Sequence, residues 1–285
     1  MGRRTPTREA LLDKMRSLRL HGMARALTAE LERAENKGVI PAEIIERLLE
    51  HEAAYQRERS LANRVANAHL PWPWTLDSFP FERQPGVSKS QILALAGLDF
   101  IKRLENVLLW GNTGVGKSGL AIAILREACL NGYRGMFYNA QTLLDELYTS
   151  LADRSTSRLI NRLSRLPILV IDELSYMTLK PEQCNAFFRL MDQRYNRVST
   201  IITSNLDPSE WHTVFQNRNL LDALLDRLQH HCIKIHIDGP SLRTGDTPGP
   251  AAGPRNPPPL PTPALPDTPA AGTVATPPPS SSRRA

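Results

Sequence analysis

Eight consecutive residues match the pattern G-x-x-x-x-G-K-[ST], in which a glycine-rich loop surrounds phosphate groups. They are Gly111, Asn112, Thr113, Gly114, Val115, Gly116, Lys117 and Ser118. Glycines allow backbone N–H groups to turn towards phosphate oxygens, and a helix that begins at such a loop directs its positive end to the same place. The lysine would bridge the β- and γ-phosphates of a nucleotide, and the serine hydroxyl would ligate Mg²⁺.

Two carboxylates follow an apolar run further along the chain. Asp172 ends the run ILVID, and Glu173 comes directly after it. A continuous apolar run of this kind is typical of a strand buried on both faces, and its carboxyl end is where parallel sheets bind ligands. We expect Asp172 to hold the hydration shell of Mg²⁺ and Glu173 to orient and deprotonate an attacking water. The alternative is an acidic helix start after a core strand.

Two weaker candidates lie downstream. Asn205 ends the segment STIITSN, where an amide could help to place a water beside the γ-phosphate, although Ser-Asn also ends strands and caps helices. Arg227 lies near the end of LLDALLDRLQHH, and by itself an arginine there is most often solvated or ion-paired. His230 and His231 are adjacent on a helix end and would not face one site, so we expect no metal there.

The apolar pattern predicts the elements that must position these side chains. Short apolar runs predict strands at 107–110, 134–139, 168–172, 199–205 and 232–237. Apolar residues at helical spacing predict helices at 118–131, 142–151, around 158, 181–195 and 220–231. Strands that alternate with helices imply an α/β fold with a parallel sheet and right-handed crossovers.

Changes in composition divide the chain into four expected parts. Residues 1–69 predict a small all-α domain, with one helix from about residue 5 to 36 and a second, continuous or broken, from 41 to about 68. Residues 70–87 combine prolines with aromatic side chains, which predicts a strap packed on the next domain. Residues 88–243 carry the α/β pattern, and the Pro-rich residues 244–285 predict a disordered tail.

Composition excludes several classes of protein. The three cysteines lie far apart in sequence without a CxxC pair, which argues against a zinc site or a disulfide framework. The N-terminal residues lack the apolar region of a signal peptide, and no segment has the roughly 18 to 20 apolar residues that a membrane span needs. We therefore expect a cytoplasmic protein without membrane contact. The net charge of +6 fits contact with a polyanion but is not specific.

Two basic sets are candidates for contact with DNA. Residues 1–25 carry seven Lys or Arg against two acids, and lysine and arginine bind phosphates without reading sequence. The candidates in this set are Arg3, Arg4, Arg8, Lys14, Arg16 and Arg19. A second stripe, Arg154, Arg158, Arg162 and Arg165, has the spacing of one face of a short helix, opposite apolar residues. Solvated helix faces are the alternative for both sets.

The order and spacing of five motifs carry a resemblance to a known family. The motifs are GNTGVGKS, LVIDELSYM, IITSNLDPSEW, ALLDRLQHH and IKIHIDGPSLR. Together they resemble the IstB-like helper ATPases of insertion sequences, AAA+ proteins related to the DnaC helicase loaders, over roughly residues 11 to 243. The resemblance implies an AAA+ sheet, ATP hydrolysis with Mg²⁺, binding to double-stranded DNA, a homo-oligomer on that DNA, and a partner transposase that receives target sites.

The resemblance also assigns residues. It implies Asn205 as a sensor of the nucleotide, Arg227 as a finger that reaches the nucleotide of a neighbouring subunit, and Arg243 as the arginine after the last strand that contacts nucleotide. The sequence differs from the usual pattern in three places. Asn112-Thr113 replaces a proline-rich segment, Gly119 replaces a common histidine, and Leu242 replaces a usual tyrosine.

Three other functions remain open on the sequence. A replicative helicase loader of the DnaC type would share the fold and differ in its partner. A small-molecule P-loop kinase would need a lid with clustered arginines and a substrate pocket, whereas this chain has an Asp-Glu pair and a sensor-like asparagine. An ATP-gated binding module would use the same loop and hardly hydrolyse ATP.

Overall fold

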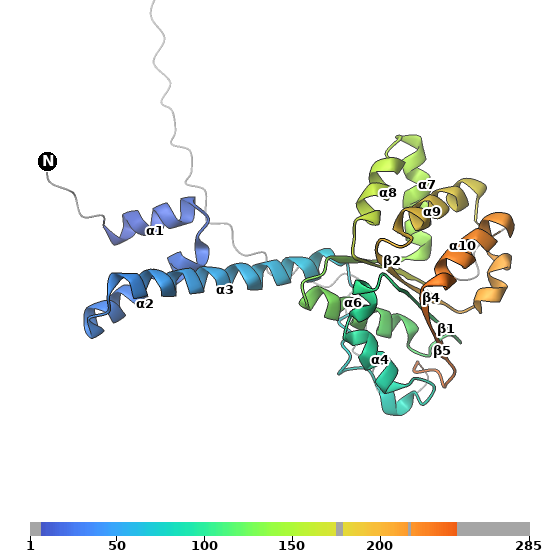
Figure 1. Cartoon of the computed structure of the whole chain (residues 1–285), viewed down its shortest axis with the longest axis horizontal. Coiled ribbons are helices and arrows are strands. Elements are labelled where there is room, and N and C mark those ends of the chain that lie inside the picture. The colour runs from blue at the N-terminus through green and yellow to red at the C-terminus, as the bar shows by residue number, and fades with distance from the viewer. Residues whose placement is uncertain (1–6, 175–178, 216–217, 244–285) are drawn as a thin grey trace, which may run out of the picture.

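A five-stranded sheet forms the centre of the computed structural model, which describes residues 7–174, 179–215 and 218–243 (Figure 1). The strands are β1 (Asn106–Gly111), β2 (Gly135–Asn139), β3 (Ile168–Asp172), β4 (Ser199–Ser204) and β5 (Cys232–Ile237). Their spatial order is β2-β3-β4-β1-β5, and every pair is parallel. The predicted α/β fold and the five predicted strands are thus confirmed. The predicted burial of β3 is also confirmed, because each of its residues is buried.

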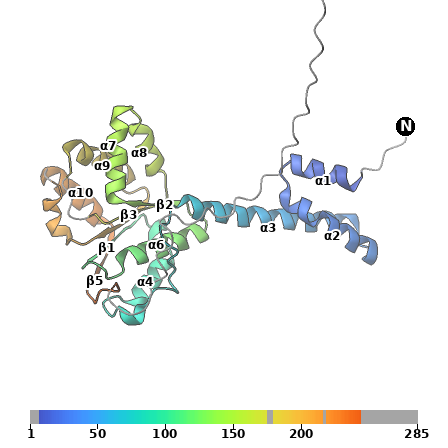
Figure 2. The ribbon, with the colours of Figure 1, turned by 180° about the vertical axis from the view of Figure 1, so that it is seen from behind.

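Helices cover both faces of the sheet (Figures 1 and 2). One face carries α7 (Ala140–Ala152), α8 (Thr156–Ser164), α9 (Pro181–Arg194) and α10 (Arg218–His230). The other carries α4 (Lys89–Ala96), α5 (Asp99–Lys102) and α6 (Lys117–Leu130). Each layer buries its own apolar cluster against the strands, so the sheet is enclosed on both sides as parallel sheets require. Apolar spacing did not predict the short α4 and α5.

Three helices form an arm that extends from the sheet: α1 (Arg8–Ser17), α2 (His21–Lys37) and α3 (Pro41–Asn67) (Figure 1). The long α3 confirms the second predicted helix and shows that it is continuous. The prediction of a single first helix is wrong, because Arg19 adopts a left-handed φ of 61° between α1 and α2. This turn allows α1 to pack along α2, where Arg8 donates to the Thr28 carbonyl and pairs with Glu32.

The strap packs on the sheet domain as its composition predicts. Phe79 and Val87 are buried in the apolar cluster beneath α6, with Trp74 and Phe81 packed against them. Phe81–Arg83 forms a single 3-10 turn. The prolines prevent a regular helix, and the aromatic side chains replace it as the source of stability.

Arg194 is a buried cation at the end of α9 that joins three elements. Its side chain is 1% exposed, and burial lowers its pKa to about 9. The guanidinium donates to the carbonyls of Leu163, Leu166 and Ser199 and to the Thr200 hydroxyl. Carbonyl groups in the last turn of α8, just after α8 and at the start of β4 therefore obtain a donor from a single side chain.

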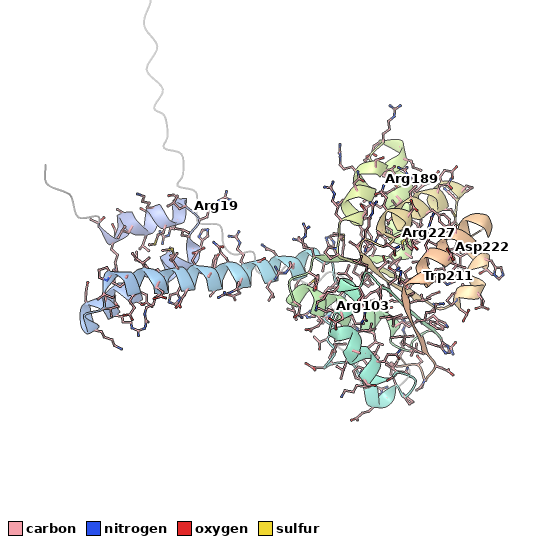
Figure 3. All side chains as sticks on the ribbon, in the orientation of Figure 1. Arg19, Arg103, Arg189, Trp211, Asp222 and Arg227 are labelled. Atoms are coloured by element: carbon pink, nitrogen blue, oxygen red, sulfur yellow. The ribbon has the colours of Figure 1, made fainter. Side chains whose placement is uncertain are left out.

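We predict that Arg194→Met lowers the free energy of unfolding by about 3 kcal/mol or more, since several buried acceptors lose their donor. Arg189→Met is the matched control, because Arg189 is exposed on the same helix (Figure 3) and should change stability by less than about 0.5 kcal/mol. Chemical denaturation of both full-length variants measures the difference. Equal losses would contradict the structural role of Arg194.

Candidate nucleotide-binding site

The glycine loop between β1 and α6 is closely packed against the strap and the segment after β5. Gly116 adopts φ 98° as the residue that caps α6, and a Cβ atom there would lie 2.7 Å from the Phe79 ring. Gly114 adopts φ 88°, and a Cβ atom would overlap the Ser241 side chain. Both positions require glycine on backbone and steric grounds. The loop is fixed further by Leu242, whose N–H donates to the Gly114 carbonyl at 2.9 Å.

Lys117 begins α6 with its ammonium group turned into the loop. Its Nζ donates to the carbonyls of Gly111 at 2.8 Å and Asn112 at 2.7 Å. Burial lowers the pKa of Lys117 to about 8, although the nearby Asp172 and Glu173 carboxylates favour the charged form. A phosphate group bound in the loop would supply the negative charge that this desolvated ammonium lacks.

Asp172, at the end of β3, faces the start of α6. The Thr203 hydroxyl donates to Asp172 Oδ1 at 2.6 Å, and the nearby Ser118 side chain favours the ionised form of this carboxylate. Burial raises the pKa of Asp172, so a cation beside it would favour the ionised form. A serine hydroxyl and a buried carboxylate are hard oxygen donors of the kind that Mg²⁺ prefers. The residues present therefore fit the predicted magnesium site.

Glu173 is held beside Asp172 in a strained conformation. Its backbone has φ 61°, and its N–H donates to the Thr203 hydroxyl at 2.9 Å. Its Oε2 accepts a hydrogen bond from Asn139 Nδ2 at 3.2 Å. Sequence reasoning missed Asn139, but the signal was present: a polar residue ends β2 in register with Asp172.

One cleft of about 640 Å³ brings most of the predicted site residues together. Its walls include Lys117, Ser118, Glu173, Asn205 and Arg243. The strap supplies a further wall through six residues that the sequence did not single out for the site: Trp72, Trp74, Ser78, Phe79, Pro80 and Arg83. Gly119 lies beneath the Trp74 ring, which a Cβ atom would meet at 3.5 Å. The cleft thus has a polar phosphate end and an aromatic end.

Gln84 joins the strap to the glycine loop. Its side chain is fully buried, and Nε2 donates to the carbonyls of Val115 and Pro240, each at 3.0 Å. A single amide therefore connects the strap, the loop and the segment that carries Arg243. The predicted strap positions the site as well as packing beside it.

Comparison with known proteins decides the family. The profile of the IstB-like ATP binding proteins matches residues 13–247 of the chain. The chain belongs to this IstB-like family. The resemblance that the five motifs indicated is therefore confirmed.

Relatives from insertion sequences match more than four fifths of the chain. An IS21 ATP-binding protein of Pseudomonas aeruginosa is 35% identical over 235 residues, which cover 82% of this chain and 88% of the relative. An IS5376 ATP-binding protein of Geobacillus stearothermophilus is 33% identical, covering 83% and 94%. The crystal structure of DnaI aligns with a TM-score of 0.51 at 19% identity, over 58% of this chain and 92% of that chain. The chain therefore shares its AAA+ P-loop fold with DnaI.

Arg227 is the catalytic candidate that the IstB-like fold leaves outside the cleft. It lies on α10, on the side of the sheet domain that faces away from the arm (Figure 3). Its Nη1 pairs with Asp192 Oδ1 of α9 at 3.0 Å, and its side chain is 43% exposed. The arginine is therefore not part of its own chain's site and is accessible to another molecule.

The first set of candidate DNA contacts lies on the arm. Arg3 and Arg4 fall outside the described residues. Arg8 is paired with Glu32 and Arg16 with Asp13, both at exposed positions. Lys14 is exposed on α1, and Arg19 occupies the turn between α1 and α2 (Figure 3). The arm thus presents several cations, two of them already neutralised in part.

The prediction of an arginine stripe on one short helix is wrong. Arg154 precedes α8 with a left-handed φ of 58°, and Arg165 follows its last residue, so only Arg158 and Arg162 belong to the helix. Arg162 pairs with Glu146 at 2.9 Å. The apolar face of this helix is buried as predicted, through Leu159, Ile160 and Leu163.

No three His, Cys, Asp or Glu side chains among the described residues are grouped so that they could hold a metal ion. None of the helices in the described part of the chain is long and apolar enough to span a membrane. The side chain of His230 lies outside the described residues.

We predict that ATP affinity falls as the pH rises above about 8. The pKa of Lys117 is lowered to about 8, and only the charged ammonium can bridge phosphates. Each further pH unit should weaken binding by about tenfold, since the complex must take up one proton. Titration calorimetry in buffers of different ionisation enthalpy measures this uptake. In Lys117→Arg the charge persists, so any binding it retains should be independent of pH in this range. Wild-type affinity that is constant to about pH 9.5 would contradict the assignment.

Proposed function

We propose that the protein hydrolyses ATP while bound to duplex DNA and delivers target sites on that DNA to a partner transposase. The proposal rests on the cleft in which Lys117, Ser118, Glu173 and Asn205 meet, in a chain whose relatives are insertion-sequence ATP-binding proteins. A nucleotide-binding site alone would serve many reactions. A carboxylate beside the phosphate loop adds the means of activating water.

The proposed reaction is in-line attack of water on the γ-phosphorus. The water oxygen forms a bond to phosphorus, the bond from phosphorus to the bridging oxygen of ADP breaks, and the Glu173 carboxylate accepts a proton from the water. Bound Mg²⁺, held through Ser118 and the hydration shell at Asp172, would neutralise charge on the β- and γ-phosphates. Lys117 stabilises the same charge from the loop, and Thr203 holds both acidic residues through its hydroxyl.

Two residues are proposed to monitor the nucleotide. Asn205 follows β4 and lies in the wall of the cleft, where its amide can help to orient the attacking water. Arg243 lies in the wall formed by the segment after β5, exposed to solvent, and is proposed to contact the bound phosphates. The backbone bond from Leu242 to Gly114 keeps this segment close to the loop even though Leu242 replaces the usual tyrosine.

Assembly on DNA is proposed to complete the site. Arg227 is accessible and lies outside its own cleft, so we propose that it reaches the nucleotide of the adjacent subunit. Hydrolysis would then require neighbouring subunits bound to the same DNA. In the four-part division of the chain at residues 69, 87 and 243, we propose that the first part, which contains the arm, contacts DNA and mediates assembly.

A replicative helicase loader of the DnaC type is the second candidate, because such a loader would share the AAA+ fold and differ in its partner. The insertion-sequence relatives, which match more than four fifths of the chain, favour the transposition function. Retention on immobilised duplex DNA with ATP, followed by capture of either an added transposase from an insertion sequence or an added replicative helicase, tests the choice. Capture of the transposase supports the proposal, whereas capture of the replicative helicase alone would contradict it.

A further inference from the structure

A second cleft, of about 500 Å³, lies between the last turns of α3 and the edge strand β2. Three arginines line it: Arg59 and Arg64 from α3, and Arg134 immediately before β2. The other lining residues from α3 carry amide or hydroxyl groups, namely Gln56, Ser60, Asn63 and Asn67. No lining residue is acidic, and none is aromatic. The cleft is therefore a concentration of hydrogen-bond donors with a net positive charge.

The two walls of this cleft are held together by specific bonds. Arg64 Nε donates to the Cys129 carbonyl at the end of α6 at 3.0 Å, and its Nη1 donates to the Ser60 hydroxyl at 2.7 Å. Just beyond α3, the Ala68 carbonyl accepts from the Phe137 N–H of β2 at 2.8 Å. These bonds fix the end of α3 against the sheet edge, so the donors on both walls are held in place for a ligand.

Two of the arginines carry uncompensated charge. Arg59 and Arg134 are exposed and make no ion pair with any residue in the described part of the chain. Arg8, Arg16 and Arg162, which the sequence proposed for DNA, each have a carboxylate partner. An arginine without a carboxylate partner, beside neutral hydrogen-bond donors, is better suited to bind an anionic ligand than an arginine that is already ion-paired.

We propose that this cleft binds the phosphate backbone of duplex DNA. The inference rests on the proposed DNA-binding function and gives it a site that the sequence did not indicate. The lining residues from Gln56 to Asn67 span about 16 Å of helix, and one strand of a duplex presents a phosphate for every 3.4 Å or so of axis. Several phosphates can therefore face the stripe at once. Without an aromatic side chain the cleft does not stack unpaired bases, which favours a duplex bound without sequence selection.

Salt-dependent DNA binding tests the proposal with matched variants of the full chain. Arg59→Gln and Arg134→Gln each remove one cleft charge, whereas Arg57→Gln removes an exposed charge of α3 that does not line the cleft. Glutamine maintains helix propensity in α3. Anisotropy of a labelled random-sequence duplex is measured at several salt concentrations. Each cleft variant should lower the slope of log K against log salt by about 0.9, and the double variant should bind roughly 10- to 100-fold more weakly at about 0.1 M salt.

The outcomes separate this inference from the proposed function. Arg57→Gln should bind DNA about as the wild type does, and ATP binding should be unchanged in all the variants. If the cleft variants bind duplex DNA with the same affinity and the same salt slope as the wild type, the inference is overturned while the proposed function stands. Cleft variants that bind DNA normally but lose retention of a poly-glutamate peptide would also overturn it, since the cleft would then recognise an acidic partner protein. Failure of the wild type to bind any duplex would overturn both.

Discussion

Arg227→Ala should bind ATP about as tightly as the wild type and lose DNA-stimulated hydrolysis by a factor of about 10³ to 10⁵, the range found for arginines that stabilise a transferring phosphoryl group. Its guanidinium lies outside its own chain's cleft and is 43% exposed, so the loss would occur at the site of an adjacent subunit. Folding should be almost unaffected, because an exposed ion pair such as that with Asp192 contributes at most about 1 kcal/mol.

Mixing two inactive variants tests the arrangement between subunits. Lys117→Ala should abolish ATP binding because it removes the charge that bridges the phosphates, but it retains Arg227. In a mixed assembly, some interfaces pair an intact loop with an intact arginine, and activity should partly return. Arg189→Ala, which removes an exposed arginine of α9, should behave as the wild type (Figure 3). Two folded variants that assemble together without any recovery would rule out the action of Arg227 on a neighbour.

Glu173→Gln should bind ATP and slow hydrolysis by about 10² to 10⁴, the contribution expected of a general base. The amide preserves the shape of the side chain and can still accept the hydrogen bond from Asn139, but it cannot accept a proton from water. Complexes with DNA should persist for longer, since ATP is not consumed. Phosphate release and the dissociation rate from duplex DNA measure the two effects.

A charge-matched control makes the Glu173 result specific. Glu182→Gln removes an exposed carboxylate from the first turn of α9 and should leave the rate unchanged. Turnover of Glu173→Gln within a few fold of the wild type would show that another group accepts the proton.

Local pattern was sufficient for the sheet and for the phosphate end of the cleft. The strands are short apolar runs bounded by turns. Lys117 and Ser118 begin the helix after β1, and Asp172 and Glu173 lie at the end of β3, so the topology of a parallel sheet brings them together. Asn205 and Arg243 also lie in the same cleft. The geometry of the glycine-loop motif is predictable from sequence because its residues lie within a few positions of one another.

Features set by packing between distant segments were not predictable. Apolar spacing continues through Arg19 and Arg154, so it cannot reveal that both residues adopt a left-handed conformation that ends a helix. The contact of Phe79 with Gly116 and the bonds of Gln84 join the strap to the loop across more than thirty residues. Likewise, Arg59 and Arg134 share a cleft only because the end of α3 is bonded to α6 and, through Ala68, to β2.

ATP turnover by the full-length wild-type protein, with and without a long duplex of random sequence, tests the central claim most directly. The proposed function predicts slow phosphate release by the protein alone and a large increase on adding DNA, because assembly brings Arg227 of one subunit to the nucleotide of the next. Lys117→Ala should release no phosphate under either condition. Wild-type protein that binds ATP and DNA but releases no phosphate with DNA present would contradict the claim, and would identify an ATP-gated binding module instead.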